Sequence, residues 1–307
     1  LTGTPVENRL EDLWSIFNFI NKGLLGSRKD FCKRYSRPIV LGDESSAERL
    51  KKRLGPFILR RLKTEVAKDL PPYTEVILYN ELSDAEREFY TRIELLARDK
   101  ILDNIGEGKG VIKMLEALLR LRQASCHQGL VPGSNVSESS KVDMLVSQLE
   151  QCVAEGHKAL IFSQWTSLLD IIAPKLTEIG IDYLRIDGQT RNRGKIVDTF
   201  QTKNSCPVLL LSLKAAGVGL NLTAADHVFI VDPWWNPAVE DQASDRTHRI
   251  GQTQHVFVHR LLMHDSIEEK MMTLKGKKQE LFKKVIETGE GIDWATAESL
   301  AFASLLS

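Results

Sequence analysis

The stretch VLLLSLKAAGVGLNLTAADHVFIVD, residues 208–232, decides the fold class of this chain. It contains two short apolar runs, 208–212 and 227–232, joined by a loop of small and polar residues. Runs that are apolar throughout are typical of strands buried on both faces of a sheet. Runs of the same kind, with helical patterns between them, are KALIFS at 158–163, YLRID at 183–187 and HVFVHRLL at 255–262. This alternation predicts an α/β domain in which helices cover both faces of a parallel sheet.

The first half of the chain has a helical pattern. Apolar residues recur at helical spacing from Leu10 to Ile20, and Thr4, Pro5 and Glu7 supply an N-cap, a first-turn proline and a capping-box acid. We therefore expect a helix that begins near Thr4.

Two more helices are predicted after a double proline. Pro71 and Pro72 precede TEVILY at 74–79, a β-type run, and we expect the chain to cross between domains there. Ser83 and Glu86 form a capping box ahead of one helix, and a further helical pattern covers residues 111–123.

Charge and cysteine content narrow the class of protein. The 41 basic and 41 acidic side chains cancel, so any surface that attracts nucleic acid must be local. The four cysteines are far apart and form no C-x-x-C pair, which favours free thiols over a disulfide framework or a zinc site, and we expect no bound metal. Because no apolar run approaches the roughly twenty residues of a membrane span, we expect a soluble intracellular protein. The first residue, Leu1, suggests a piece of a longer chain.

The loops after the strands are the expected place for chemistry, because open parallel sheets bind ligands at the carboxyl ends of their strands. The loop after residue 212 contains Gly217, Gly219 and Asn221, whose backbone amides can approach phosphates, although a tight turn explains these residues equally well. Trp234 and Trp235 follow the next strand, where they belong either to a core or to an exposed contact.

A pair of arginines completes the set of candidates. In DQASDRTHRIGQ, residues 241–252, Arg246 and Arg249 are three positions apart, which on a helix places them on one side together with Gln242. A planar guanidinium is suited to clamping a phosphate, whereas the alternative is an ordinary solvated helix face.

Together, and not singly, these segments resemble the motifs of the Swi/Snf family of DNA-translocating ATPases, within helicase superfamily two. LTGTPVENRLEDLWSIFNFI resembles motif III, FILRRLKTEVAKDLPP the inter-lobe segment and KALIFSQWTSLLDII motif IV. VLLLSLKAAGVGLNLTAADHV is similar to motif V, and DPWWNPAVEDQASDRTHRIGQ to motif VI and its approach. The likeness extends to about Ile286. Tyr73 and Gln128 depart from it, because family members usually have lysine and proline there, outside the nucleotide site.

The resemblance implies two RecA-like lobes that close on ATP and Mg²⁺, with this chain supplying the second lobe and helical protrusions. It implies that Arg246 and Arg249 are arginine fingers, that Gln242 helps to hold them, and that Gly217, Gly219 and Asn221 lie near the nucleotide. It further implies contacts to double-stranded DNA from Ser163, Gln164, Lys214 and Trp235. The partners it implies are that DNA, the first lobe and a DNA-bound protein to be remodelled, in the cytoplasm of a bacterium or the nucleus of a eukaryote.

The same resemblance predicts the domain organisation. The expected parts are the end of the first lobe at 1–5, a helical protrusion with the inter-lobe segment at 6–70, a linker strand with a second protrusion at 71–130, the second lobe at 131–264, and a brace helix with a tail at 265–307.

Half of an ATPase site has no counterpart in the sequence. Neither G-x-x-x-x-G-K-[ST] nor a DE-x-H box occurs, and both belong to the first lobe in the family. We therefore expect this chain alone to hold no nucleotide and to be inactive. Two alternatives remain: the RecA-like lobe of an RNA helicase of the same superfamily, and a non-enzymatic protein-interaction module.

Overall fold

The computed structural model describes residues 10–40, 43–59, 67, 69–102, 110–134, 136, 138–216, 219–234 and 237–273. The chain divides into two compact units, one made of Leu1–Lys68 with Met272–Ser307 and the other of Asp69–Met271. The division falls just before Pro71 and Pro72, where a domain crossing was expected. Nothing that was predicted for Leu1 to Pro5, for Glu7 or for the end of the brace helix lies within the described residues.

The first unit is a small helical bundle. Its helices are α1 Leu10–Ile20, α2 Arg28–Phe31, the π-helical turn η1 Cys32–Ser36, α3 Arg37–Val40, α4 Glu44–Leu54 and the 3-10 turn η2 Gly55–Phe57. Leu13, Phe17 and Phe31 pack with Leu50 and Leu54 to form its core. This core is separate from those of the second unit, so the helical pattern read from Leu10 onward builds an independent apolar cluster.

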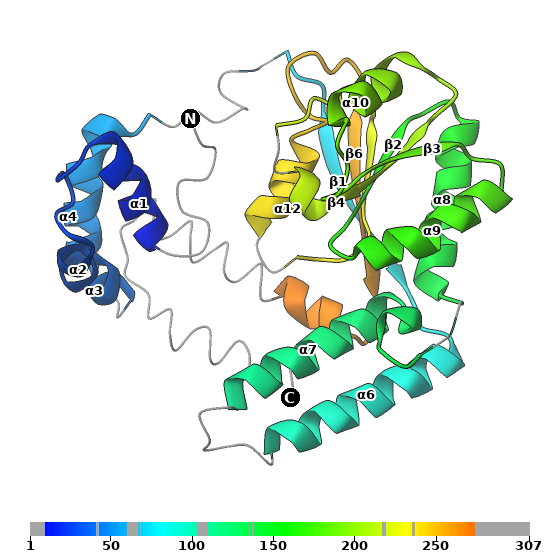
Figure 1. The fold of residues 1–307 in the computed structure, drawn as a ribbon, viewed down its shortest axis with the longest axis horizontal. Helices are drawn as coiled ribbons and strands as arrows, with labels where there is room; N and C mark the ends of the chain where they lie inside the picture. Colours follow the sequence, from blue (N-terminus) through cyan, green and yellow to red (C-terminus); the bar gives the residue numbers. More distant parts are fainter. Residues whose placement is uncertain are drawn as a thin grey trace. The chain divides into compact units, whose positions relative to one another are not determined.

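The second unit contains a parallel six-stranded sheet (Figure 1). The strands are β1 Tyr73–Asn80, β2 Ala159–Ser163, β3 Tyr183–Ile186, β4 Val208–Ser212, β5 His227–Ile230 and β6 Val256–Met263, in the order β1-β6-β5-β2-β4-β3. Every residue of β2 and of β4 is buried, because both strands lie inside the sheet and are covered on both faces. The predicted parallel sheet is therefore confirmed, with the five expected runs as β2 to β6.

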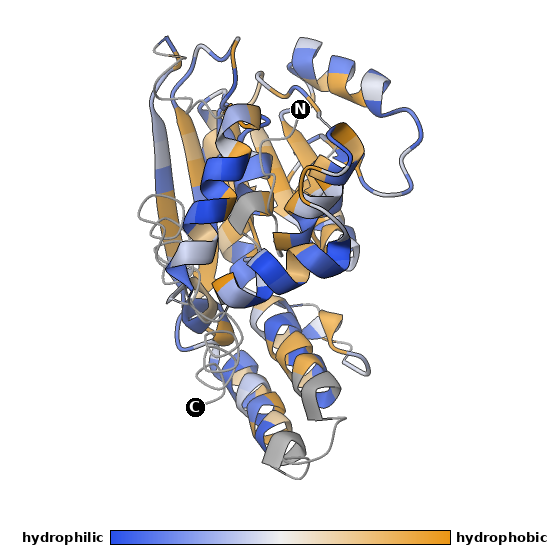
Figure 2. Cartoon of the chain, turned by 90° about the vertical axis from the view of Figure 1, so that its left-hand side faces the viewer, coloured by the Kyte–Doolittle hydropathy of each residue, from blue (hydrophilic) through white to orange (hydrophobic). Residues whose placement is uncertain are grey.

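Alternate residues of the strands form two cores, one on each face. Ile161 and Leu210 pack with α8 Ser140–Ala154 and α9 Thr166–Glu178. Leu160 and Leu209 pack on the other face against α10 Arg193–Thr202 and α12 Pro237–Ser244. Figure 2 shows the strands as mostly apolar and the helices as apolar only in part, as expected for helices that turn one face to solvent.

β1 is a full edge strand of the sheet. It pairs in parallel with β6 from Tyr73 opposite Val256 to Asn80 opposite Met263. The sequence predicted a linker strand within residues 71–130, because the residues around β1 do not indicate that its partner strand lies so far along the chain. β1 belongs to the second compact unit, Asp69–Met271. The domain boundaries expected at residues 130 and 264 stay predictions.

A helical hairpin follows β1. It consists of α6 Asp84–Leu102 and α7 Gly110–Cys126, which lie side by side beyond one end of the sheet in both views (Figures 1 and 2). The predicted capping box is confirmed: Ser83 N donates to Glu86 Oε2 at 2.9 Å, and Glu86 N donates to Ser83 Oγ at 3.4 Å. Residues 267–273 form the beginning of the helix that was expected after Ser266.

The four cysteines are free thiols, with Cys126 and Cys152 buried. Among the described helices, none combines the length and the apolar character that crossing a bilayer requires.

Candidate functional site

The two candidate arginines lie on a series of tight turns. α12 ends at Ser244, and residues 245–251 form turns in place of the helix that the spacing suggested. Arg246 N donates to Ala243 O at 3.2 Å, and Thr247 N donates to Ser244 O at 3.1 Å. Hydrogen bonds between residues three apart are those of a 3-10 turn, which is tighter than an α-helical turn. Gly251 then adopts φ +103°, which only glycine accepts readily. The expectation of a helical Arg246 and Arg249 is therefore wrong, although the pair remains close enough to interact.

Gln252 fixes the arginine turn, which we define as residues 245–252. Its side chain is buried, and Nε2 donates to the backbone oxygens of Thr223 at 3.1 Å, Ala225 at 2.8 Å and Thr247 at 3.3 Å. Leu222 N also donates to Arg246 O at 3.0 Å. The loop after β4, with Gly219 and Asn221, is therefore bonded directly to the arginine turn.

The guanidinium of Arg246 is not neutralised by its surroundings. Its Nε atom is buried and has no hydrogen-bond partner among the described residues. Burial, and next the nearby charge of Arg249, lower the pKa of Arg246. Arg249 is exposed and Gln242 is half-buried at the end of α12. Asp245 opposes these effects in part. Two like charges held close together, one of them with an unsatisfied donor, form a site that attracts an anion.

The loop after β4 exposes the other predicted groups of that segment. Lys214 lies on α11 Leu213–Ala216, and its side chain is exposed. Gly219 has φ +45°, which favours glycine, and nothing lies within 4 Å of the position that a Cβ would occupy. Asn221 is exposed, with its backbone oxygen accepting from Gln201 Nε2 at 3.0 Å. Gly217 lies outside the described residues.

The loop after β2 carries Ser163 and Gln164. Ser163 is opposite Ser212 in the sheet, so this loop and the Lys214 loop leave the same edge. The Ser163 side chain is buried, and its hydroxyl accepts from Trp165 N at 2.9 Å. Gln164 N donates to both carboxylate oxygens of Asp232 at 3.2 Å, which joins the loop to the end of β5. Gln164 is partly accessible, but its Nε2 atom is buried and has no hydrogen-bond partner among the described residues. The Ser163 hydroxyl shapes the turn.

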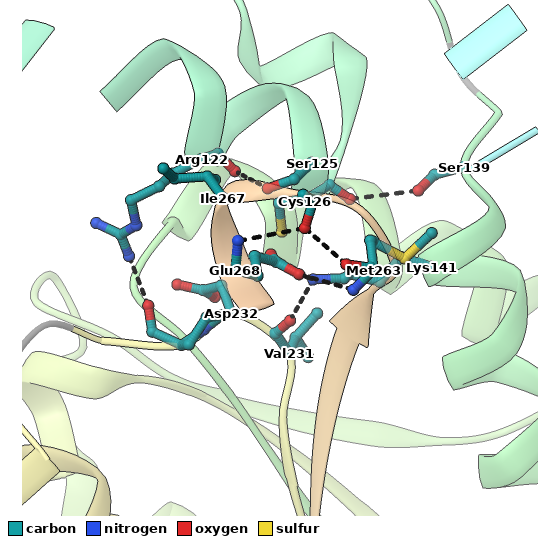
Figure 3. A network of polar contacts seen from close by, with 12 residues as sticks. Arg122, Ser125, Cys126, Ser139, Lys141, Val231, Asp232, Met263, Ile267 and Glu268 are labelled. Atoms are coloured by element: carbon teal, nitrogen blue, oxygen red, sulfur yellow. Dashed lines mark hydrogen bonds and ion pairs between the residues drawn. The ribbon is translucent and has the colours of Figure 1, made fainter. Parts of the chain in front are cut away.

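A buried polar network supports these loops (Figure 3). Arg122 of α7 donates to Pro233 O at 2.7 Å, and its guanidinium lies 5.9 Å from the ring centre of Trp165 and 5.7 Å from that of Trp234. These contacts connect α7 with the loops after β2 and β5. Trp234 is thus half-buried as part of a packed cluster, whereas Trp235 lies outside the described residues.

Lys141 and Glu268 form the second part of this network. Lys141 Nζ lies 2.6 Å from Glu268 Oε1 and also donates to Val231 O at 3.0 Å. Nearby, burial raises the pKa of Asp232 to about 6, against the opposing effects of Ser163 and Arg122. Sequence reasoning missed these supporting residues. Arg122 is one of three cations in the helical run 111–123, so the sequence carries no signal that distinguishes it.

Comparison with known proteins assigns the family. The SNF2-related domain family matches residues 1–130, and the helicase conserved C-terminal domain family matches residues 140–251. The second match contains the loops after β2, β4 and β5 and most of the arginine turn. The chain belongs to the Swi/Snf family. The predicted membership is confirmed, and the sheet with its covering helices is the RecA-like lobe of this family.

Three Swi/Snf relatives indicate how much of a whole protein this chain represents. A human SWI/SNF-related matrix-associated actin-dependent regulator of chromatin, subfamily A member 1, is 38% identical over 95% of this chain and 29% of its own length. A putative ATP-dependent helicase/translocase of Bacillus subtilis is 37% identical over 98% of this chain and 34% of its own length. The SWI2/SNF2 ATPase core of Sulfolobus solfataricus in complex with double-stranded DNA is 36% identical, with a TM-score of 0.62 over 97% of this chain and 64% of that structure. The chain thus spans about a third of the curated relatives.

Proposed function

We propose that this chain is the second RecA-like lobe of an ATP-dependent translocase on double-stranded DNA, and that Arg246 and Arg249 are its arginine fingers. One observation carries the proposal: the half-buried guanidinium of Arg246 has an unpaired Nε, and the largest effect of a neighbouring charge on its pKa comes from a second arginine, Arg249, ahead of the opposing Asp245. A cationic pair of this kind matches the anionic oxygens of a triphosphate. Gln242, in the last turn of the adjoining helix, is proposed to help orient the pair.

The two arginines would act on charge that develops during hydrolysis. Water attacks the γ-phosphorus, the bond between the γ-phosphorus and the bridging oxygen breaks, and the electron pair stays on the oxygen of ADP. A guanidinium placed there stabilises the transition state more than the ground state, which raises kcat. ATP and Mg²⁺ themselves would be held mainly by a first lobe, since this sequence lacks the phosphate loop and the DE-x-H box. Gly217, Gly219 and Asn221 are proposed to approach the nucleotide from the second lobe.

DNA contact is assigned to the loops after β2, β4 and β5. Exposed Lys214 and partly exposed Gln164 are proposed to contact phosphates, and Trp235 to contact the groove. The buried hydroxyl of Ser163 supports a different role, in which it shapes the turn that presents Gln164. The duplex bound by the Sulfolobus relative and the chromatin regulation named for the human relative support double-stranded DNA and a remodelled DNA-bound protein as partners.

The test uses the full-length protein that contains this lobe. Arg246→Ala and Arg249→Ala should each lower DNA-stimulated kcat by about a thousand-fold, while affinity for double-stranded DNA stays within about twofold. Lysine should restore little activity, because a point charge does not reproduce the planar fork. Arg92→Ala is the matched control, since Arg92 is an exposed arginine on α6 that forms a surface ion pair with Glu88.

Two results would contradict the proposal. Either alanine variant that retained near wild-type kcat would remove that arginine from the catalytic role. Stronger stimulation of the wild-type enzyme by RNA than by double-stranded DNA would favour the RNA-helicase alternative.

A further inference from the structure

A group of histidines lies at the opposite end of the sheet from the nucleotide and DNA loops. His157 precedes β2, His227 begins β5, and His259 lies in β6, which is next to β5. Because these strands are parallel, the starts of β2 and β5 are far from the carboxyl ends that carry the proposed function. Nothing in the proposed ATPase cycle uses this end of the sheet.

Backbone bonds hold three potential ligand residues together there. Asp226 N and His227 N both donate to Lys158 O at 3.2 Å, and Phe257 N donates to Asp226 O at 2.8 Å. His157, Asp226 and His227 each offer one ligand atom, and these atoms lie within 4.8 Å of one another. Ligands of a tetrahedral zinc ion, bound at about 2.0–2.1 Å, are roughly 3.4 Å apart, so small side-chain rotations would close the set.

A second observation points to a missing partner at the same place. Asp226 is 6% exposed, and its Oδ2 atom is 2.5 Å from His157 Nδ1. Its Oδ1 atom is buried and has no hydrogen-bond partner among the described residues. A buried carboxylate oxygen without a donor is costly, and a bound cation is one of the few groups that satisfies it.

A fourth residue, His259, supports one of these side chains. His227 Nδ1 lies 3.0 Å from His259 Nε2, and the two rings are stacked. His259 is thus placed as a partner that orients the His227 ring.

We propose that His157, Asp226 and His227 form a binding site for a divalent transition-metal cation of the zinc class. Two nitrogens and one oxygen suit zinc, whereas Mg²⁺ and Ca²⁺ prefer oxygen ligands alone. The ion would connect the end of the α8–β2 connection to the beginning of β5, with a fourth position open to water or to Glu155, whose Oε2 lies 4.0 Å from His157 Nε2. Its role would be to stabilise the lobe, independently of ATP hydrolysis.

The experiment measures metal binding by the 307-residue chain itself. After treatment with a chelator, titration calorimetry with ZnCl₂ at neutral pH should show one tight site, and zinc should raise the melting temperature whereas MgCl₂ should not. Co²⁺ should give a tetrahedral absorption spectrum without a thiolate charge-transfer band, because no cysteine belongs to the set.

Variants then assign the ligands. His157→Gln and His227→Gln should each weaken zinc affinity at least roughly 100-fold, and His259→Gln by about tenfold. His255→Gln is the matched control: this neighbouring histidine contacts Thr74 Oγ1 at 2.7 Å and stacks on Phe257, and its loss should leave affinity unchanged. His157 is partly exposed, so its variant is expected to fold, which circular dichroism checks. Absence of zinc binding by the wild-type chain, or unchanged affinity in both ligand variants, would overturn the proposal.

Discussion

Lys141 and Glu268 form a fully buried ion pair that joins the first turn of α8 to the helix after β6. Lys141 Nζ lies 2.6 Å from Glu268 Oε1, and each side chain is only 1% exposed. The remaining bonding capacity is also used, because Lys141 donates to Val231 O and Glu268 accepts from Met263 N at 3.0 Å. Removing one member of such a buried ion pair strongly destabilises the fold, because the other member is left as an uncompensated buried charge.

Glu268→Gln should therefore destabilise the chain strongly. The substitution keeps the shape but leaves the Lys141 ammonium buried without an opposite charge, so we expect a loss of about 3–5 kcal/mol in the free energy of unfolding. Urea denaturation measures it. The matched control is Lys175→Met, which breaks an exposed pair of the same 2.6 Å length with Asp143 and should cost less than about 1 kcal/mol. Equal losses in the two variants would show that burial does not determine the strength of the Lys141 pair.

Asp232 should make the stability of the lobe depend on pH. Its pKa in the folded chain is raised by burial to about 6 from 3.8, so the folded state favours the protonated carboxyl. The stability that this proton supplies is present below pH 4 and is lost as pH rises through 6. Relative to Asp232→Asn, the wild-type chain should lose about 2.4 kcal/mol between pH 4 and pH 7.

Asp187 provides a control of opposite sign for that titration. Its pKa is lowered, because Gln189 N, Thr190 and Arg185 outweigh the effect of burial. The advantage of the wild-type chain over Asp187→Asn should therefore be present at pH 7 and shrink as pH falls below about 4. Urea midpoints across this pH range measure both effects. A constant difference between the wild type and Asp232→Asn would refute the assignment for Asp232.

Gln252 should act on the arginines through the turn that it holds. Gln252→Glu keeps the acceptor oxygen but replaces the donor that bonds three backbone oxygens, so those oxygens face a repelling carboxylate. We expect a loss of roughly 2 kcal/mol or more in stability. In the full-length enzyme, kcat should fall at least tenfold with little change in DNA affinity. Thr253→Ala serves as control, because Thr253 donates to Gln252 Oε1 through its backbone N, which alanine keeps. A stable, fully active Gln252→Glu enzyme would remove the positioning role.

Lys214 should contribute one phosphate contact. In the full-length protein, Lys214→Ala should weaken DNA binding and reduce the slope of log affinity against log salt by about one unit. Fluorescence anisotropy at several salt concentrations measures both quantities. Lys203→Ala is a suitable comparison, since Lys203 is an exposed lysine at the end of α10, shortly before β4 begins and therefore toward the opposite edge of the sheet. An unaltered slope in the Lys214 variant would leave this lysine without a role in DNA binding.

The sequence alone determined the elements of the lobe. Short apolar runs such as 208–212 predict buried strands, because a strand that is covered on both faces is apolar along its whole length. The runs that form β2 to β6 were predicted correctly. The capping box at Ser83 could also be predicted from the sequence, because its two residues bond within one helical turn. The motif order was enough to place the chain in its family.

Only the tertiary structure decided which distant residues meet. β1 pairs with β6 although most of the sequence of the second unit lies between them. Lys141 and Glu268 are separated by 127 positions. The turn that holds Arg246 depends on Gln252 and on carbonyl groups of the loop before β5, so the helix suggested by the arginine spacing gives way to tertiary bonds. His157 and Asp226 are likewise 69 positions apart. Burial and pairing of polar side chains arise from the packing of separate elements, and local periodicity carries no information about which elements become neighbours.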